Sequence, residues 1–359
     1  MGKLVRNVQR VLKRIDRSLS GPLVEFSEQF LYGHREILIS HAQLGNKAMV
    51  KGSVEHGWAL DSGKGIRKFP SGRYLYLSWA EARILRSKID DPMTIAIGAP
   101  FIYAHAAVRD TLREFKIQNL SAERDTLFFP VHGNEFSQQN AESQVQLFTE
   151  HYSPTKATVC LYWVEYVNPQ IYGYYKSMGF NIVCSGFSGQ MEHTGLGYSA
   201  RRLAGSPIGG RPNFILNTIA IFASYENVVF GGIGSGLFYA AYMEKNITLL
   251  HKYLSTSYLD MDYEWGVTFN ESPEGMRYVK YIADSLECEF ADIDYNSEKF
   301  RELAKQELGV PSMRSPTELK QLLEPHITHI ANPQSLNIYE NSIQDFESIL
   351  HSYEKSREG

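Results

Sequence analysis

At 359 residues the chain is longer than a single hydrophobic core usually supports, so we expect two domains. Its hydrophobic share of 43% and charged share of 21% are typical of an ordinary globular protein. The net charge of −4 argues against a nucleic-acid partner, because nucleic-acid binders normally carry a basic face. The three cysteines are far apart and form no zinc-binding or disulfide pattern, which favours a reducing, cytoplasmic compartment.

The first segment, KLVRNVQRVLKRIDRSL, has the pattern of a basic amphipathic helix over residues 3–19. Such a helix can lie on an anionic membrane surface, or it can pack on the protein with its basic face in water. No apolar run approaches the roughly 18 residues of a membrane span, and no signal-peptide pattern opens the chain. We therefore expect a cytoplasmic protein, with peripheral contact at the inner face of the cytoplasmic membrane if the helix binds lipid.

Predicted strands and helices alternate through the first part of the chain. EILISHAQLG and AMVKGSVEHGW predict a helix followed by a strand. YLYLSWAEARILRSKI predicts a strand and then a helix that starts near Ser78. MTIAIGAPFIYAHAAV predicts a buried strand that ends at Gly98, followed by an apolar helix.

The same alternation continues through the second part. DTLFFPVHGNEF predicts a strand from Thr126 to Val131. ATVCLYWVEY predicts another strand, followed by a helix from Ile171 to Met178 and the strand FNIVCSG. Residues 214–253 predict a helix–strand–turn–helix–strand series. Strands that alternate with helices of this length imply parallel sheets in a layered α/β fold.

The division between two α/β halves is expected in NEFSQQNAESQ, which is polar and lacks a strong periodic pattern. This gives an N-terminal domain over residues 1–135 and a C-terminal domain over residues 136–359. The chain then ends in predicted helices. These are EKFRELAKQELG, a helix capped by Ser315 or Thr317, and SIQDFESILHSYEKS.

The stretch GGIGSG, residues 231–236, lies between the strand VVF and the helix LFYAAYM. Glycines at this place let the backbone approach a ligand, and free N–H groups of a first helical turn attract an anion. The stretch matches neither the P-loop nor the dinucleotide-binding fingerprint. Two interpretations stay open, a cradle for a phosphate and a tight packing turn.

Titratable residues follow other predicted strands. His132 and Glu135 come just after TLFFPV, and Glu55 and His56 follow the first strand. They can act as acids or bases, but they can also satisfy backbone groups in a turn or cap a helix. Arg201 ends a long Gly/Ser-rich loop that is either solvated or able to pair with phosphate or carboxylate. No metal-binding motif is evident, and we expect no metal.

The chain resembles two-domain glycosyltransferases of the GT-B type, and more narrowly bacterial surface-polysaccharide proteins. The resemblance rests, in chain order, on VEHGWALD, TIAIGAPFIY, LFFPVHGNE, TVCLYWVEY, YKSMGFNIVCSG and VVFGGIGSGLFYAAYMEKNITLL. The last stretch is similar to the segment of Kdo- and sialyl-transferase-like enzymes that holds the donor nucleotide. CSGFSGQ departs from the CGHR-like segment of the β-Kdo transferases, because it lacks the arginine.

This resemblance implies two Rossmann-like domains with a cleft between them, followed by C-terminal helices. It implies a nucleotide-sugar donor, such as a CMP-linked Kdo- or sialic-acid-like sugar, and a saccharide or lipid-linked saccharide acceptor. No cofactor is implied. Gly234, Ser235 and Gly236 would contact the donor phosphate, with Gly186 and Ser188 nearby.

The implied reaction transfers the sugar to an acceptor hydroxyl, while helix N-terminal amides, Ser235 and a basic side chain stabilise the leaving phosphate. His132 and Glu135 would face the cleft, and Glu135, Glu55 or His56 would deprotonate the acceptor. Two alternatives stay open. One is a nucleotide-sugar epimerase on the same fold, and the other is a non-catalytic sugar-binding member of a polysaccharide assembly complex.

Overall fold

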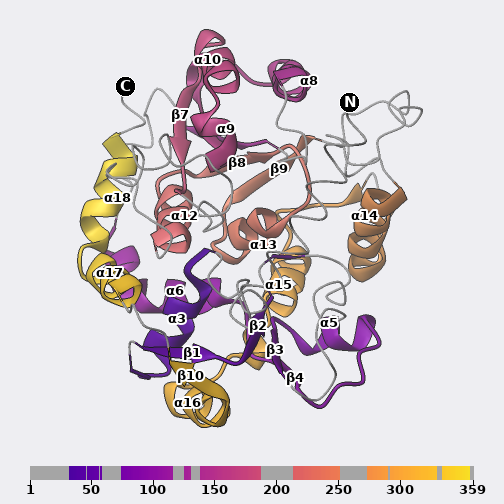
Figure 1. Ribbon diagram of the computed structural model, residues 1–359. Helices are drawn as coiled ribbons and strands as arrows, with labels where there is room; N and C mark the ends of the chain where they lie inside the picture. Colours follow the sequence, from indigo (N-terminus) through magenta and orange to yellow (C-terminus); the bar gives the residue numbers. More distant parts are fainter. Residues whose placement is uncertain are drawn as a thin grey trace, which may run out of the picture.

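The computed structural model confirms an α/β protein with parallel sheets (Figure 1). It describes residues 32–45, 47–55, 57–58, 74–115, 125–130, 138–186, 213–250, 273–289, 292–329 and 334–355. The predicted basic helix over residues 3–19 lies outside these ranges. None of the helices in the described part of the chain has the length and apolar character that crossing a bilayer requires.

The larger sheet has five parallel strands in the order β7-β6-β5-β8-β9. They are β5 (Thr126–Phe129), β6 (Ala157–Leu161), β7 (Asn181–Cys184), β8 (Asn227–Phe230) and β9 (Asn246–Leu249). The first strand of this sheet along the chain, β5, is therefore its central strand. The next two strands, β6 and β7, are added on one side of β5, and β8 and β9 are then added on the other side. The predicted strands are confirmed here, although β5 ends at Phe129 rather than at Val131.

Helices cover both faces of the larger sheet (Figure 1). Leu127 packs in the cluster that contains α12 (Phe214–Ala223) and α13 (Ser235–Tyr242). The neighbouring Phe128 packs in the cluster that contains α8 (Gln138–Thr149) and α10 (Pro169–Ser177). Successive side chains of a strand point to opposite faces, so a sheet covered on both sides needs apolar residues at every position. All five residues of β6, ATVCL, are buried, and the polar Thr158 among them accepts hydrogen bonds from Tyr225 and Asn181.

A smaller sheet lies in the first part of the chain. Its parallel strands are β2 (Gly52–Val54), β3 (Leu75–Ser78) and β4 (Thr94–Ala96), with α5 (Glu81–Arg86) after β3 and α6 (Pro100–Ala107) after β4. A separate antiparallel pair joins β1 (Ala48–Val50) to β10 (Ile327–His329) from the end of the chain.

The segment expected to separate the two halves is instead a helix. Ala141, Val145 and Phe148 of α8 are buried and lie on one helical face. The many glutamines and asparagines around them conceal this pattern in the sequence. The change from the smaller sheet to the larger one falls between β4 and β5, because β5 is the central strand of the larger sheet.

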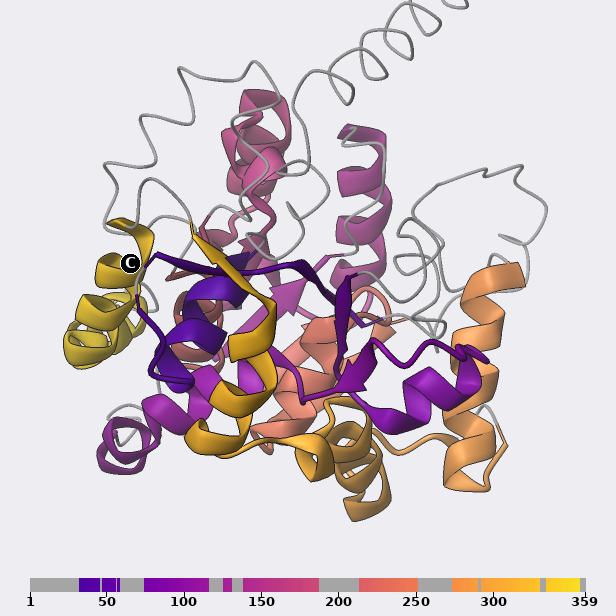
Figure 2. The ribbon, with the colours of Figure 1, turned by 60° about the horizontal axis from the view of Figure 1, so that its bottom comes forward.

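The C-terminal helices follow the larger sheet, and part of the series contacts the first part of the chain (Figure 2). They are α14 (Pro273–Leu286), α15 (Glu298–Glu307), α16 (Pro316–Leu323), α17 (Gln334–Gln344) and α18 (Phe346–Lys355). Ser315, one of the two predicted caps, accepts a hydrogen bond from the backbone N–H of Glu318 at 3.3 Å. The single terminal helix that we expected is divided, because α17 packs on α3 (His34–His41) whereas α18 packs on α12.

The two parallel sheets share one hydrophobic core. A single buried cluster contains Leu77 of the smaller sheet and Leu127 of the larger one. Helices α6 and α13 bridge them, with the ring of Phe101 stacked on that of Tyr239 at 3.9 Å between centroids. The two halves therefore stabilise each other directly.

His105 lies in the same contact between α6 and α13. Its ring packs edge-on against Tyr242 at 5.2 Å. Burial, with a smaller contribution from the positive charge of Arg109, lowers the pKa of His105 from 6.5 to about 4. The folded protein therefore keeps His105 neutral at a pH where the unfolded chain binds a proton.

We expect this histidine to weaken the fold as the pH falls from 6.5 towards 4. At pH 5 the loss should be roughly 1–2 kcal/mol, because unfolding then takes up a proton. Urea unfolding at pH 7 and pH 5 should show a smaller loss in His105→Gln than in the unmodified protein. His151→Gln, at an exposed histidine, is the control substitution. Equal losses in all three proteins would contradict the assignment.

Candidate functional site

The glycine-rich turn lies where the larger sheet reverses its direction of growth. After β5 the chain enters α8 on one face, and after β8 it enters α13 on the other. Gly231 donates its N–H to the carbonyl of Phe129 at 2.8 Å, so the turn starts against the end of β5. In open α/β sheets such a reversal leaves a crevice at the carboxyl ends of the strands, where ligands bind.

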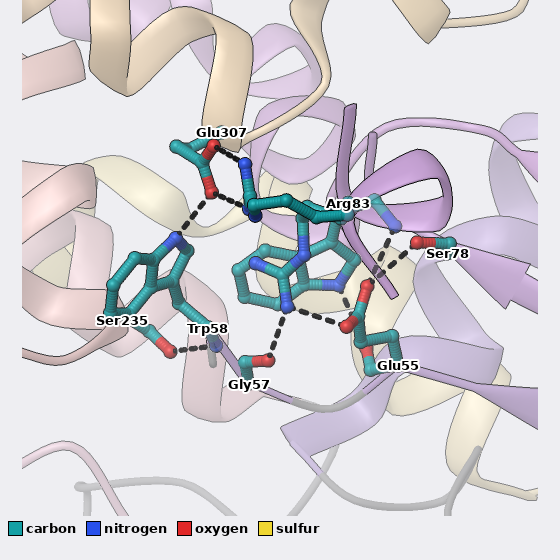
Figure 3. Close-up of polar contacts among 9 residues, drawn as sticks. Glu55, Gly57, Trp58, Ser78, Arg83, Ser235 and Glu307 are labelled. Carbon is teal, nitrogen blue, oxygen red and sulfur yellow. Dashed lines mark hydrogen bonds and ion pairs between the residues drawn. The ribbon is translucent and has the colours of Figure 1, made fainter. Parts of the chain in front are cut away.

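The smaller sheet reaches the same place from the opposite side. Trp58 follows the carboxyl end of β2, and its backbone N–H donates to the Ser235 hydroxyl at 2.8 Å (Figure 3). Ser235 is the first residue of α13, which follows β8. The carboxyl ends of both parallel sheets therefore meet at the contact between Trp58 and Ser235.

The two glycines beside Ser235 differ in their surroundings. A Cβ on Gly236 would lie 3.2 Å from the ring of Phe230, so this position is tightly packed. Around Gly234 no heavy atom of the described structure lies within 4 Å of such a Cβ, and its φ of −167° is extended. Packing thus accounts for Gly236, whereas no described atom crowds a side chain at Gly234.

Glu55 is held by protein donors on both carboxylate oxygens (Figure 3). It forms a buried ion pair with Arg83, and it accepts hydrogen bonds from the Ser78 hydroxyl at 3.0 Å and the Trp79 N–H at 2.9 Å. These bonds join the end of β2 to β3 and α5. We therefore assign Glu55 a structural role and do not retain it as a candidate base.

The sequence did not reveal a second buried carboxylate, Glu307 of α15. It accepts the indole N–H of Trp58 at 2.7 Å, two hydrogen bonds from Arg86 at 2.9 Å each, and the Tyr281 hydroxyl at 2.6 Å. Burial raises the pKa of Glu307, but the hydrogen bonds and charge of Arg86, with the hydrogen bond of Tyr281, outweigh it and lower the pKa overall. The sequence did contain one indication that Glu307 is buried. Its helical spacing places it on the same face of α15 as the apolar residues Phe300, Leu303 and Ala304.

Gly186 does not lie at this crevice. It follows β7, which lies three places from β8 in the sheet. With neighbouring strands roughly 4.8 Å apart, the ends of β7 and β8 are about 14 Å apart. Gly186 adopts a left-handed φ of +95° and donates its N–H to the Cys184 sulfur at 3.4 Å. Its conformation is therefore explained by the local turn.

The other candidate residues lie outside the described part of the chain. They are His56, His132, Glu135, Ser188 and Arg201. The described residues contain no group of three or more histidine, cysteine, aspartate or glutamate side chains arranged to hold a metal ion. In the described structure, Trp58, Gly234 and Ser235 lie together where the carboxyl ends of the two parallel sheets meet.

We compared the chain with protein-family models, curated proteins and solved structures. No family model, no curated protein and no solved structure matches the chain.

Proposed function

We propose that this chain is a glycosyltransferase of the GT-B type, with two Rossmann-like units, that acts in the synthesis of a bacterial surface polysaccharide. Its donor is a nucleotide-activated sugar, and its acceptor is a hydroxyl of a saccharide or lipid-linked saccharide. The donor phosphate would lie at the N-terminus of α13, between the turn that begins at Gly231 and the loop that carries Trp58.

The observation that supports this proposal best is the strand order β7-β6-β5-β8-β9. It has the form of the order 3-2-1-4-5 found in dinucleotide-binding folds, and it places the glycine-rich turn at the point of reversal. The smaller parallel sheet reaches the same place through the hydrogen bond from Trp58 to Ser235. A nucleotide sugar needs two such surfaces, one for the nucleotide and one for the acceptor.

The chemistry requires stabilisation of the negative charge that develops on the leaving phosphate. The free N–H groups at the start of α13 point towards an anion placed there, and the Ser235 hydroxyl adds a further donor. Because Glu55 is bound by Arg83, the acceptor base is sought among His56, His132 and Glu135.

The test uses the open space at Gly234. In Gly234→Val the extended backbone accepts the new side chain, but the added atoms occupy the space in front of α13. We expect one of the CMP-, UDP- and GDP-sugars to raise the melting temperature of the unmodified protein and to leave that of Gly234→Val unchanged. Without ligand, Gly234→Val should be less stable by about 1 kcal/mol, because valine is a poorer N-cap than glycine.

Gly45→Val is the matched control, because Gly45 also has no described heavy atom within 4 Å of an added Cβ. It should keep the full thermal shift. If none of the three classes of nucleotide sugar stabilises the unmodified protein, the proposal is wrong.

A non-catalytic sugar-binding protein is the second candidate, and the pairing of Glu55 with Arg83 favours it. Such a protein would show the same thermal shift but no consumption of donor. Analysis of the donor after incubation with saccharide acceptors separates the two functions. Conversion of the donor without any acceptor would instead indicate an epimerase.

A further inference from the structure

Trp58 joins two helices that are far from it in the sequence, α13 and α15. Its backbone N–H donates to Ser235 at the start of α13, and its indole N–H donates to Glu307 of α15 (Figure 3). Its ring lies against that of Phe238 with 4.4 Å between centroids. The side chain is 7% exposed, so both faces of the indole are largely covered by protein.

The anchor of this connection is rigid. Glu307 is 1% exposed, and its oxygens accept from Arg86 and Tyr281 as well as from Trp58. Arg83 fixes the preceding loop in the same way, because its guanidinium contacts the carboxylate of Glu55 and the carbonyl of Gly57. The side chain of Trp58 is therefore held by Glu307, and the backbone just before it is held by Arg83.

The hydrogen bond from Trp58 also determines what the Ser235 hydroxyl can do. A hydroxyl has one proton to donate and two lone pairs that accept. Trp58 N–H occupies one lone pair. With this donor at one lone pair, the Ser235 hydroxyl keeps its proton and can donate it to an acceptor such as a phosphate oxygen.

We propose that Trp58 is a positioning residue of the donor site, which holds Ser235 as a hydrogen-bond donor for a nucleotide phosphate. This inference rests on the proposed function, and it adds that the first part of the chain contributes to nucleotide binding. Trp58 acts through Ser235 and does not itself contact the phosphate.

Trp58→Phe removes the indole N–H and keeps an aromatic ring against Phe238. Calorimetric titration with CMP, UDP and GDP first identifies which nucleotide the unmodified protein binds. We expect Trp58→Phe to bind that nucleotide about tenfold more weakly, because the loop loses its hydrogen bond to the charged anchor. The matched control is Tyr281→Phe, which removes a different hydrogen bond from Glu307 and should keep the affinity of the unmodified protein.

Equal affinity of Trp58→Phe and the unmodified protein overturns the inference while leaving the proposed function intact. Equal weakening in Tyr281→Phe also overturns it, since the effect would then arise from Glu307 alone. Absence of nucleotide binding to the unmodified protein removes the proposed function itself.

Hydrogen–deuterium exchange on the unmodified protein gives a second measurement that needs no substitution. The bound nucleotide should slow exchange in the peptide that contains Trp58 as well as at the start of α13. Slowing at α13 without any change at Trp58 would overturn the inference.

Discussion

Replacing Gly309 by alanine should destabilise the protein by about 3–4 kcal/mol. Gly309 has a left-handed φ of +70°, and a Cβ there would lie 1.7 Å from the carbonyl oxygen of Trp79 and 3.1 Å from the Cα of Gly98. The chain after α15 thus crosses the ends of β3 and β4 at backbone contact. No side-chain rotation can relieve a clash between a Cβ and a backbone carbonyl, so the crossing itself must open. Urea unfolding measures the loss.

Gly173→Ala provides the control for this substitution. Gly173 lies inside α10, and no described heavy atom comes within 4 Å of an added Cβ. Alanine should stabilise this helix by roughly 0.5–1 kcal/mol, because glycine has the larger conformational entropy when unfolded. Two alanine variants with opposite effects would show that the backbone crossing, and not the loss of a glycine as such, governs stability. A Gly309→Ala variant as stable as the unmodified protein contradicts this explanation.

Glu307→Gln should cost about 3 kcal/mol at pH 7. The amide keeps the size of the side chain but removes the charge that pairs with Arg86 and strengthens the hydrogen bonds from Trp58 and Tyr281. Arg86 is 22% exposed, so water partly compensates its loss of partner. This places the expected cost at the lower end of the range for buried pairs.

The stability lost in Glu307→Gln should depend on pH and become smaller in acid. The pKa of Glu307 in the folded protein is lower than its ordinary value of 4.5, so its stabilisation is complete above pH 4.5 and is lost as the pH falls through the lowered pKa. The difference between the unmodified protein and Glu307→Gln should therefore shrink in acid. Glu302→Gln on the exposed face of the same helix should change stability by less than about 0.5 kcal/mol. A difference that stays constant down to pH 3 would contradict the assignment.

Local patterns in the sequence predicted most of the secondary structure, because these patterns depend on neighbouring residues. The buried run of β6, the apolar strand before Gly231 and the capping serine at 315 all follow from residues within one or two turns of each other. The failures have a local cause as well. In α8 the apolar residues Ala141, Val145 and Phe148 are correctly spaced, but polar residues between them conceal the helix.

The candidate site was predicted only in part. The turn from Gly231 to Gly236 was recognisable, since a glycine-rich segment between a strand and a helix has few structural uses. The roles of individual residues were not, because they depend on partners elsewhere. The sequence alone made Glu55 a candidate base, whereas the structure shows that its carboxylate is paired with Arg83. No local pattern could predict the role of Trp58, because its hydrogen-bond partner Glu307 lies 249 positions further along the chain.

The sequence by itself determined the α/β class, the alternation of strands and helices, and the glycine-rich turn that opens α13. Each of these follows from hydrophobic spacing and backbone freedom over a few residues. Tertiary structure alone decided the order of the strands, the shared core and the meeting of Trp58 with Ser235. Those features depend on which distant segments exclude water together and satisfy each other's buried polar groups, and no local pattern encodes that choice.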